Sequence, residues 1–291
     1  MPIVPLNEVS ALYGSGIDGD VTISGASSLT KHRAYRELTI GAAGVLSPSG
    51  MMVHASRRIV ILSGGQIERK GGAASGPTAG TAPAAGQFGQ QVWGAGTGTT
   101  GAGGGGVAHA ITYCTLGATG GAGGAGTAGA GASWGDLVDS TNYGFAWYGG
   151  LVQIMQMAMW GGGSYRVLSA GSGGKQGSGN GAAGTGGGGG ASGSIIIMAA
   201  PEIVIESASQ SIDARGGAGG AGSAAGCGGG GGGAGGAIVL IARKITLASG
   251  ASISTVCDVS GGAGGASGGG AGVAGSAGTS GNLMYPEGAL S

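Results

Sequence analysis

The residues of this chain whose types could do chemistry are few and scattered. The three histidines, His32, His54 and His109, are far apart in the sequence, and none belongs to a cluster with metal-ligand spacing. The three cysteines are an odd number without CxxC spacing, so they predict neither a zinc site nor a disulfide framework. A catalytic triad assembled only in space stays open, but ordinary polar positions are the favoured interpretation of the histidines.

Glycine-rich motifs of nucleotide-binding proteins and hydrolases also occur, but each lacks its structural context. G-x-G-x-x-G recurs in the glycine fields, yet no copy follows a strand, opens a helix and has an acidic partner downstream. The stretch 169–176, SAGSGGKQ, departs from the phosphate-binding loop at its first glycine and at its Ser/Thr position. The stretch 265–269, GASGG, matches the nucleophile elbow, but no helix-forming sequence follows it. We interpret all three as consequences of composition.

Two pairs of acidic residues could contact a cation or a polar ligand. Asp18 and Asp20 lie at the first β-prone stretch, and Asp136 and Asp139 are three residues apart. Neither pair matches a calcium-binding loop, so turn residues and a solvated surface are the favoured interpretations. No paired carboxylates of a glycosidase stand out. The sequence therefore predicts no enzyme activity, no cofactor and no metal site.

The most informative chemical feature is the placement of the aromatic residues, since ten of the thirteen lie between Phe88 and Tyr165. Aromatic side chains offer a large contact area with little conformational entropy to lose, which suits a binding surface or the face of a sugar. The candidate binding residues are Trp93, Trp134, Tyr143, Phe145, Trp147 and Tyr148. Two alternatives stay open. These residues form the ordinary hydrophobic core, or Trp134 and Trp160 are buried while 142–148 is displayed on a loop.

The elements that would position such a surface are organised around a cassette that occurs twice in 186–265. Each copy has a glycine run and then an apolar strand, at 195–198 or 238–241. A second strand with alternating apolar residues, a third short element containing Ile212 or Ile253 and a closing GGAGG follow. Self-similarity at this spacing is typical of stacked or solenoidal architectures.

Glycine supplies 78 of the 291 residues, about a quarter of the chain, against roughly 7% in average proteins. Long glycine runs fit helices of the polyproline-II type, whose amides and carbonyls can bond neighbouring helices. Many such helices must pack together to offset the entropy lost by ordering glycine. We therefore expect an elongated all-β fold with little or no α-helix. It would combine short-stranded cassettes like those of a β-helix or solenoid with packed polyglycine-II helices. Flexible linkers are the alternative.

Several classes of protein are disfavoured by charge and by the apolar segments. The formal net charge is zero, which gives no support for a nucleic-acid partner. The start, MPIVPLNEVSALYG, lacks the pattern of a secretory signal. The longest apolar run, 151–160, is too short and too often broken to insert in a membrane. We expect a protein made in the cytoplasm.

Several segments resemble the tail and tip adhesins of tailed bacteriophages. They are the fields GGAGGAGTAGAGA, GGAGGAGSAAGCGGGGGGAGG and GGAGGASGGGAG, separated by strands such as SIIIMAAPEIVI and AIVLIARKITL. The resemblance covers roughly 18–281 and implies a layered sandwich of polyglycine-II helices whose terminal loops bind the host surface. The segment DGDVTISGASSLTKHRAYRELTIGAAGVLSPSG is similar to the start of many glycine-rich phage tail proteins, which implies a β-rich part that attaches to the virion. The tandem β-cassettes depart from the tip-adhesin pattern.

Together the residues and the resemblance predict three regions. Residues 1–70 would be a β-rich attachment region, 71–185 a glycine-rich region with the aromatic recognition loops, and 186–291 the tandem cassettes with polyglycine-II fields. A degenerate cassette begins at Leu38, and a further diverged one is a hypothesis for the stretch after Gly149.

The predicted function is that of a tail-fibre, tail-tip or spike adhesin on the virion surface, assembled in the host cytoplasm. Its partners would be other virion proteins and a host surface glycan or protein, and self-association stays open. One alternative is a structural spike or head-decoration protein without receptor binding. A second is an ice-binding bundle of glycine helices, although its simple three-residue repeat is missing.

Overall fold

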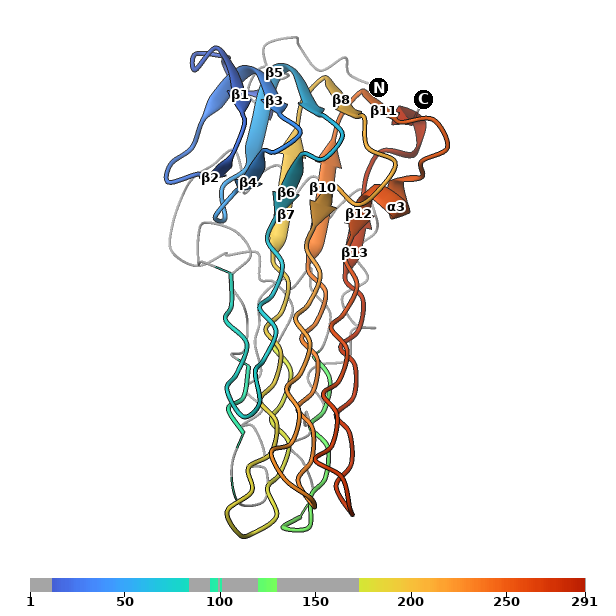
Figure 1. The fold of residues 1–291 in the computed structure, drawn as a ribbon. Helices are drawn as coiled ribbons and strands as arrows, with labels where there is room; N and C mark the ends of the chain where they lie inside the picture. Colours follow the sequence, from blue (N-terminus) through green and yellow to red (C-terminus); the bar gives the residue numbers. More distant parts are fainter. Residues whose placement is uncertain (1–11, 84–94, 99, 101–119, 130–172, 291) are drawn as a thin grey trace, which may run out of the picture.

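A computed structural model describes residues 12–83, 95–98, 100, 120–129 and 173–290. Figure 1 shows an elongated molecule with β-strands gathered at one end, called the head, and long glycine-rich runs extending from it, called the stalk. The regular secondary structure of the described residues is almost entirely β-strand, as expected of an all-β fold. Helix there consists of residues 12–13, the single turn α3 (Ile253–Val256) and the 3-10 turn η1 (Glu287–Ala289).

The head consists of two parallel sheets. The strands of the first are β1 (Asp20–Ile23), β3 (Ala34–Ile40), β5 (Val53–Ile61), β7 (Ile195–Ala199), β8 (Glu202–Ile205), β10 (Ala237–Ile241), β11 (Lys244–Leu247) and β13 (Asn282–Met284). The strands of the second are β2 (Ala26–Ser28), β4 (Val45–Ser47), β6 (Gln66–Glu68), β9 (Ile212–Asp213) and β12 (Cys257–Asp258). Strands from the first 70 residues and from both cassettes therefore share the same sheets.

Five consecutive strand pairs stack on one another, each with one strand in either sheet. In chain order they are β1–β2, β3–β4, β5–β6, β8–β9 and β11–β12. The strands are parallel and aligned so that apolar residues of one pair lie beside apolar residues of the next. One such row is fully buried and consists of Leu38, Ile59, Ile203 and Ile245. Because β-branched side chains pack well on a pleated surface, the row favours this alignment over a one-residue shift.

The cassettes form the strands that the sequence predicts, but the two copies differ at their third short element. Ile212 lies in β9, whereas Ile253 begins the helical turn α3. Ser252 caps this turn by accepting the N–H of Thr255, and Cys257 is the residue that pairs with Ile212. Near the N-terminus, β3 and β5 are longer than the expected strands of three to five residues.

The strands β7 and β10 are buried on both faces. Ile196 and Ile238 are paired and face the main core between the two sheets. Ile195 and Val239 face a second, smaller core that includes Tyr13. Continuous apolar sequence is typical of strands covered on both sides, which explains the runs IIIM and IVLI.

Each glycine run of the stalk bonds its neighbours with a period of three residues. The run 228–236 illustrates this, because its N–H groups point to three neighbours in turn. Gly228 and Gly231 donate to the run 173–179, Gly229, Gly232 and Gly235 to the run 272–281, and Gly230, Gly233 and Gly236 to the run 214–222.

The carbonyls of the same central run accept from three further neighbours, so six runs surround it. The donors to the carbonyls of 228–234 belong to the runs 186–194, 120–126 and 259–268. The six surrounding runs are also bonded to one another around the ring. Within the described stalk, away from the turns, each contact is one-way, with one run supplying the N–H groups and the other the carbonyls. A run therefore needs six neighbours to use all its backbone groups, and all of 228–236 is buried.

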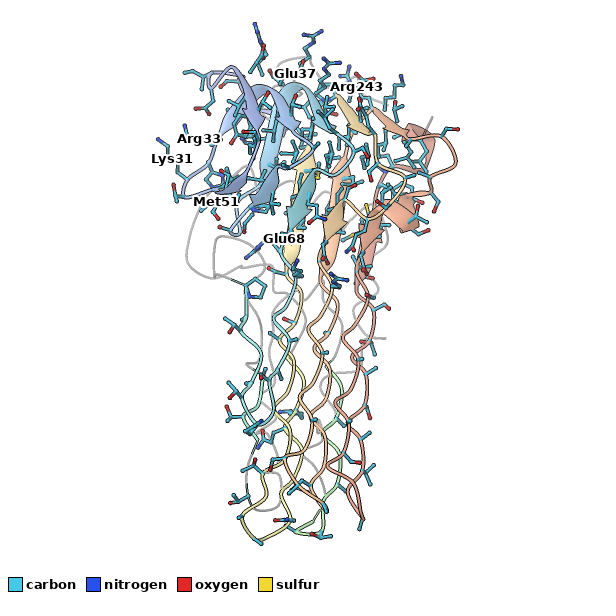
Figure 2. The ribbon with its side chains drawn as sticks, in the orientation of Figure 1. Lys31, Arg33, Glu37, Met51, Glu68 and Arg243 are labelled. Atoms are coloured by element: carbon cyan, nitrogen blue, oxygen red, sulfur yellow. The ribbon has the colours of Figure 1, made fainter. Side chains whose placement is uncertain are left out.

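Glycine is required in this arrangement because the backbones touch. A Cβ added at Gly232 would overlap the carbonyl oxygen of Gly262, and one at Gly230 would overlap that of Gly188. Outer runs carry a larger residue at every third position, where it faces solvent, as Ala263 and Ala266 do. Figure 2 shows these short side chains projecting outward along the stalk. A run that is surrounded by other runs on all sides therefore consists almost entirely of glycine, whereas an outer run carries larger residues on its exposed side.

Candidate functional site

The candidate contact surface is the end of the stalk farthest from the head, where the chain reverses direction several times (Figure 1). Short polar or alanine-containing turns interrupt the glycine runs there. The described turns are 127–128, 180–185, 223–226 and 267–271. Gly181 and Gly226 have φ near +78° and +79°, a conformation that glycine adopts without strain.

Asn180 fixes one turn and joins it to the next. Its Oδ1 accepts the N–H groups of Ala182 at 3.0 Å and Gly184 at 3.1 Å. Its Nδ2 donates to the carbonyl oxygen of Ala225 at 3.2 Å. Asparagine commonly bonds the backbone two residues further on in this way, which holds a turn in one conformation.

Hydroxyl groups cross-link further turns, and a backbone bond from the N–H of Gly226 to the carbonyl of Gly269 joins the turn 267–271. Thr127 donates through Oγ1 to the carbonyl of Asn180 at 3.3 Å. The N–H of Thr185 donates to Oγ of Ser223 at 2.8 Å, and the N–H of Ser223 donates to the carbonyl of Thr185 at 2.9 Å. Ser178, just before the Asn180 turn, donates to the carbonyl of Gly129 at 2.8 Å. The turns therefore form one hydrogen-bonded surface whose shape exists before any partner arrives.

The outward groups of this surface are uncharged. Ala182, Ala183, Ala224 and Ala225 are exposed, together with glycine backbone. No Asp, Glu, Lys or Arg occurs in the four described turns. Methyl groups, amides and hydroxyls can contact a partner through shape and neutral hydrogen bonds. The four described turns contain no ionisable side chain that could act as an acid or a base.

Charged side chains gather instead where the stalk meets the head, beside a cleft of about 700 Å³. Figure 2 places Glu68 at this level, with Glu37 and Arg243 at the opposite end of the head. The cleft is lined by the ends of β4 and β6 and by the first residues of several glycine runs. Lys70 pairs with Glu68 at 2.6 Å, and Arg215 pairs with Asp213 at 3.2 Å.

The carboxylates at this junction have a structural role, since they accept backbone N–H groups where a strand ends and a glycine run begins. Oδ1 of Asp213 accepts the N–H of Arg215, and Oδ1 of Asp258 accepts that of Ser260. Burial raises the pKa of Asp213, although Arg215 opposes this shift. Burial also lowers the pKa of Arg69 to about 10, and its Nη1 donates to the carbonyl of Ile195 at 3.1 Å.

The other groups singled out from the sequence also have structural partners where the structure describes them. Asp18 accepts the backbone N–H of Ala34, and Asp20 pairs with Arg36. Burial lowers the pKa of His54 and raises that of Cys257 to about 12, so this thiol is not a ready nucleophile. Among the described residues there is no group of three or more His, Cys, Asp or Glu arranged to hold a metal ion.

The predicted binding residues cannot be located on this surface. Trp93, Trp134, Tyr143, Phe145, Trp147 and Tyr148 all lie outside the described residues, as does the diverged cassette proposed after Gly149. The turns at the end of the stalk were not predicted from the sequence. Their signal is the appearance of Asn, Thr and Ser between glycine runs, as in SGNGAAGTG and GAGSAAGC, which is typical of turns.

Comparisons with known proteins add no identification. No family model, curated protein or solved structure matches the chain. In the described part of the chain, no helix is both long and apolar enough to cross a membrane.

Proposed function

We propose that the glycine runs are polyglycine-II helices in a hexagonal lattice and that the strand pairs form a short β-solenoid. Three residues per turn and bonds only to neighbours define polyglycine II, and the period of three along 228–236 supports this assignment. The regular stacking of strand pairs in two parallel sheets supports the solenoid.

The proposed function is adhesion: a non-enzymatic virion protein holds a recognition surface away from the particle. The observation that carries it is the construction of the stalk, which ends in a hydrogen-bonded group of uncharged turns opposite the head. A stalk whose backbone groups bond six neighbours resists bending, so it keeps this surface at a fixed distance. Nothing in the described stalk suggests transport or chemistry as its use.

In this proposal the head faces the tail, fibre or spike to which the protein is attached, and the turns face a host surface glycan or protein. The described stalk beyond the junction carries one charged side chain, Lys175. Contact through such a surface depends on shape and neutral groups, so neither nucleic acid nor a membrane is the proposed partner.

Matched arginine substitutions test whether the turns make the contact. Ala183→Arg places a long charged side chain on the end surface, whereas Ala263→Arg places the same side chain on the flank of the stalk. Because a desolvated, unpaired charge weakens an interface strongly, we expect particles with Ala183→Arg to adsorb about tenfold more slowly or worse. Ala263→Arg particles should adsorb normally. Equal adsorption of both variants and the parent would favour a purely structural spike.

The aromatic segment forms a second arm of the same experiment. Replacing Tyr143, Trp147 and Tyr148 together with Ala should abolish adsorption without lowering the thermal stability of the protein, if these rings are hot spots of the contact. A loss of stability would instead assign them to a hydrophobic core. Unchanged adsorption and stability would remove them from the proposed site.

A further inference from the structure

The two ends of the stack of strand pairs differ in whether another segment of the described chain lies beside them. At the β11–β12 end, the C-terminal segment lies beside the last strand, since Leu290 bridges to Ile245 in the parallel direction. Ala289 in the same segment is only 4% exposed. At the other end, the structure describes no strand beyond β1 or β2. Among the described residues, the stack is thus covered at its C-terminal end and open at its N-terminal end.

The open end presents backbone groups suited to pairing. The carbonyls of Gly19 and Ile23 accept bonds from Arg36 and Gly41 on the β3 side. Because residues of a parallel strand face its two neighbours alternately, the backbone of Asp20 and that of Thr22 face the open side. All three residues of β2 are exposed. Such an edge is a template for another strand.

A row of charged residues across the first sheet indicates which charge a strand that pairs with this edge should carry. In successive strands the row runs Asp20, Glu37, Arg58, Glu202 and Lys244. Nε of Arg58 lies 2.8 Å from Glu37, and Nζ of Lys244 lies 3.5 Å from Glu202. The signs alternate from Glu37 onward, whereas Asp20 at the open end stands next to the like-charged Glu37 and forms an exposed ion pair with Arg36. A basic residue on the next strand would place a second opposite charge beside Asp20, across the strand pair, a favourable arrangement.

We propose that the β1–β2 end binds the terminal coil of a parallel β-stack in a partner protein, through a strand with a basic residue opposite Asp20. Apolar residues of that strand would lie opposite Val21 and Ile23, continuing the rows of the core. The proposal rests on the attachment of the head to the virion proposed above. It identifies the attaching surface and the chemistry of its partner strand.

The opposite end of this same chain has the required sequence, which explains the C-terminal cover. Lys244-Ile245-Thr246-Leu247 set against Asp20-Val21-Thr22-Ile23 would repeat the alignment that joins β1 to β3. Two copies could therefore stack end to end if β11 were free. The segment 286–290 occupies that place and keeps the open end available for another protein.

The match between β11 and the open edge of β1 can be tested by exposing β11. A variant ending at Tyr285 exposes β11 and should assemble into chains in sedimentation velocity, while the full chain does not. Adding the full chain should shorten the assemblies, because it offers an open β1 end and a covered β11 end. Asp20→Lys in the shortened variant should weaken assembly about fivefold or more, and adding Lys244→Asp should restore it.

A folded shortened variant that sediments like the full chain would overturn the proposal, as would assembly indifferent to Asp20→Lys. If the shortened variant does not fold, the peptide RKITLAS (243–249) is titrated into the full chain. The amide resonances of Asp20, Val21 and Thr22 should then shift, and unchanged resonances would overturn the proposal. On particles, Asp20→Lys should lower the amount of protein attached. Protein that is attached but does not adsorb would instead contradict the proposed adhesion.

Discussion

Replacing Gly232 with Ala should lower the free energy of unfolding by roughly 3 kcal/mol or more, although only one methyl group is added. Gly232 lies in the surrounded run, where a Cβ would overlap the carbonyl oxygen of Gly262. Moving that carbonyl would disturb its bond from Gly278. The backbone conformation itself would tolerate alanine, so the cost measures the packing of the lattice. Urea unfolding gives the value from the shift of the midpoint at constant slope.

The matched control is Ala277→Val, which adds two methyl groups to an outer run. Ala277 is exposed, and Val273 on the same run already holds a side chain that is 53% exposed. We expect a change within about 0.5 kcal/mol. If Gly232→Ala were as mild as this control, the central run would not be packed as described.

Ile196→Ala should cost about 2–5 kcal/mol, the usual range for emptying a buried isoleucine site. Ile196 is fully buried in β7 and pairs with Ile238 in β10. The run 186–194 continues directly into β7, and the N–H of Ser194 donates to the carbonyl of Arg69 at 2.9 Å. Head and stalk therefore share strands and bonds. Destabilising this core should lower the stability of both.

The measurement follows the head through amide exchange of β3 and β5 and the stalk through amide exchange of the run 228–236, in the same denaturant series. A common midpoint, shifted equally by Ile196→Ala, is the expected result. Val204→Ala, at a half-buried position of β8, should shift it much less. Separate midpoints for head and stalk would show that the two parts fold independently.

The strands of the head could be predicted because the type and order of their side chains are typical of buried strands. Runs such as IIIM and IVLI combine β-branched residues with flanking glycine, and they appear as β7 and β10. The type of the short element at Ile253 could not be predicted, because an apolar residue at this position suits a strand or a helical turn. The cap formed by Ser252 and Thr255 decides for the turn. Local hydrogen bonds thus override a pattern of hydrophobicity.

The sequence indicates the outward side of a glycine run but not which runs become its neighbours. Alanine or serine at every third position, as in GGAGGAS, indicates which side of a run faces outward. Which runs become neighbours is decided by backbone bonds alone, and these bonds are the same for every glycine. The turns at the stalk's end were missed because aromatic residues, the stronger sign of a binding surface, drew the prediction to a segment outside the described residues.

Hydrogen exchange of the central glycine run tests the main claim most directly, because an ordered lattice protects amides that a flexible linker leaves open. The probe is a proteolytic peptide covering 226–236, compared with one covering β7. We predict that the glycine peptide exchanges as slowly as the core strand, with a similar free energy of opening. Complete exchange within seconds, at the rate of an unstructured chain, would contradict the account of the stalk as a packed, rigid support.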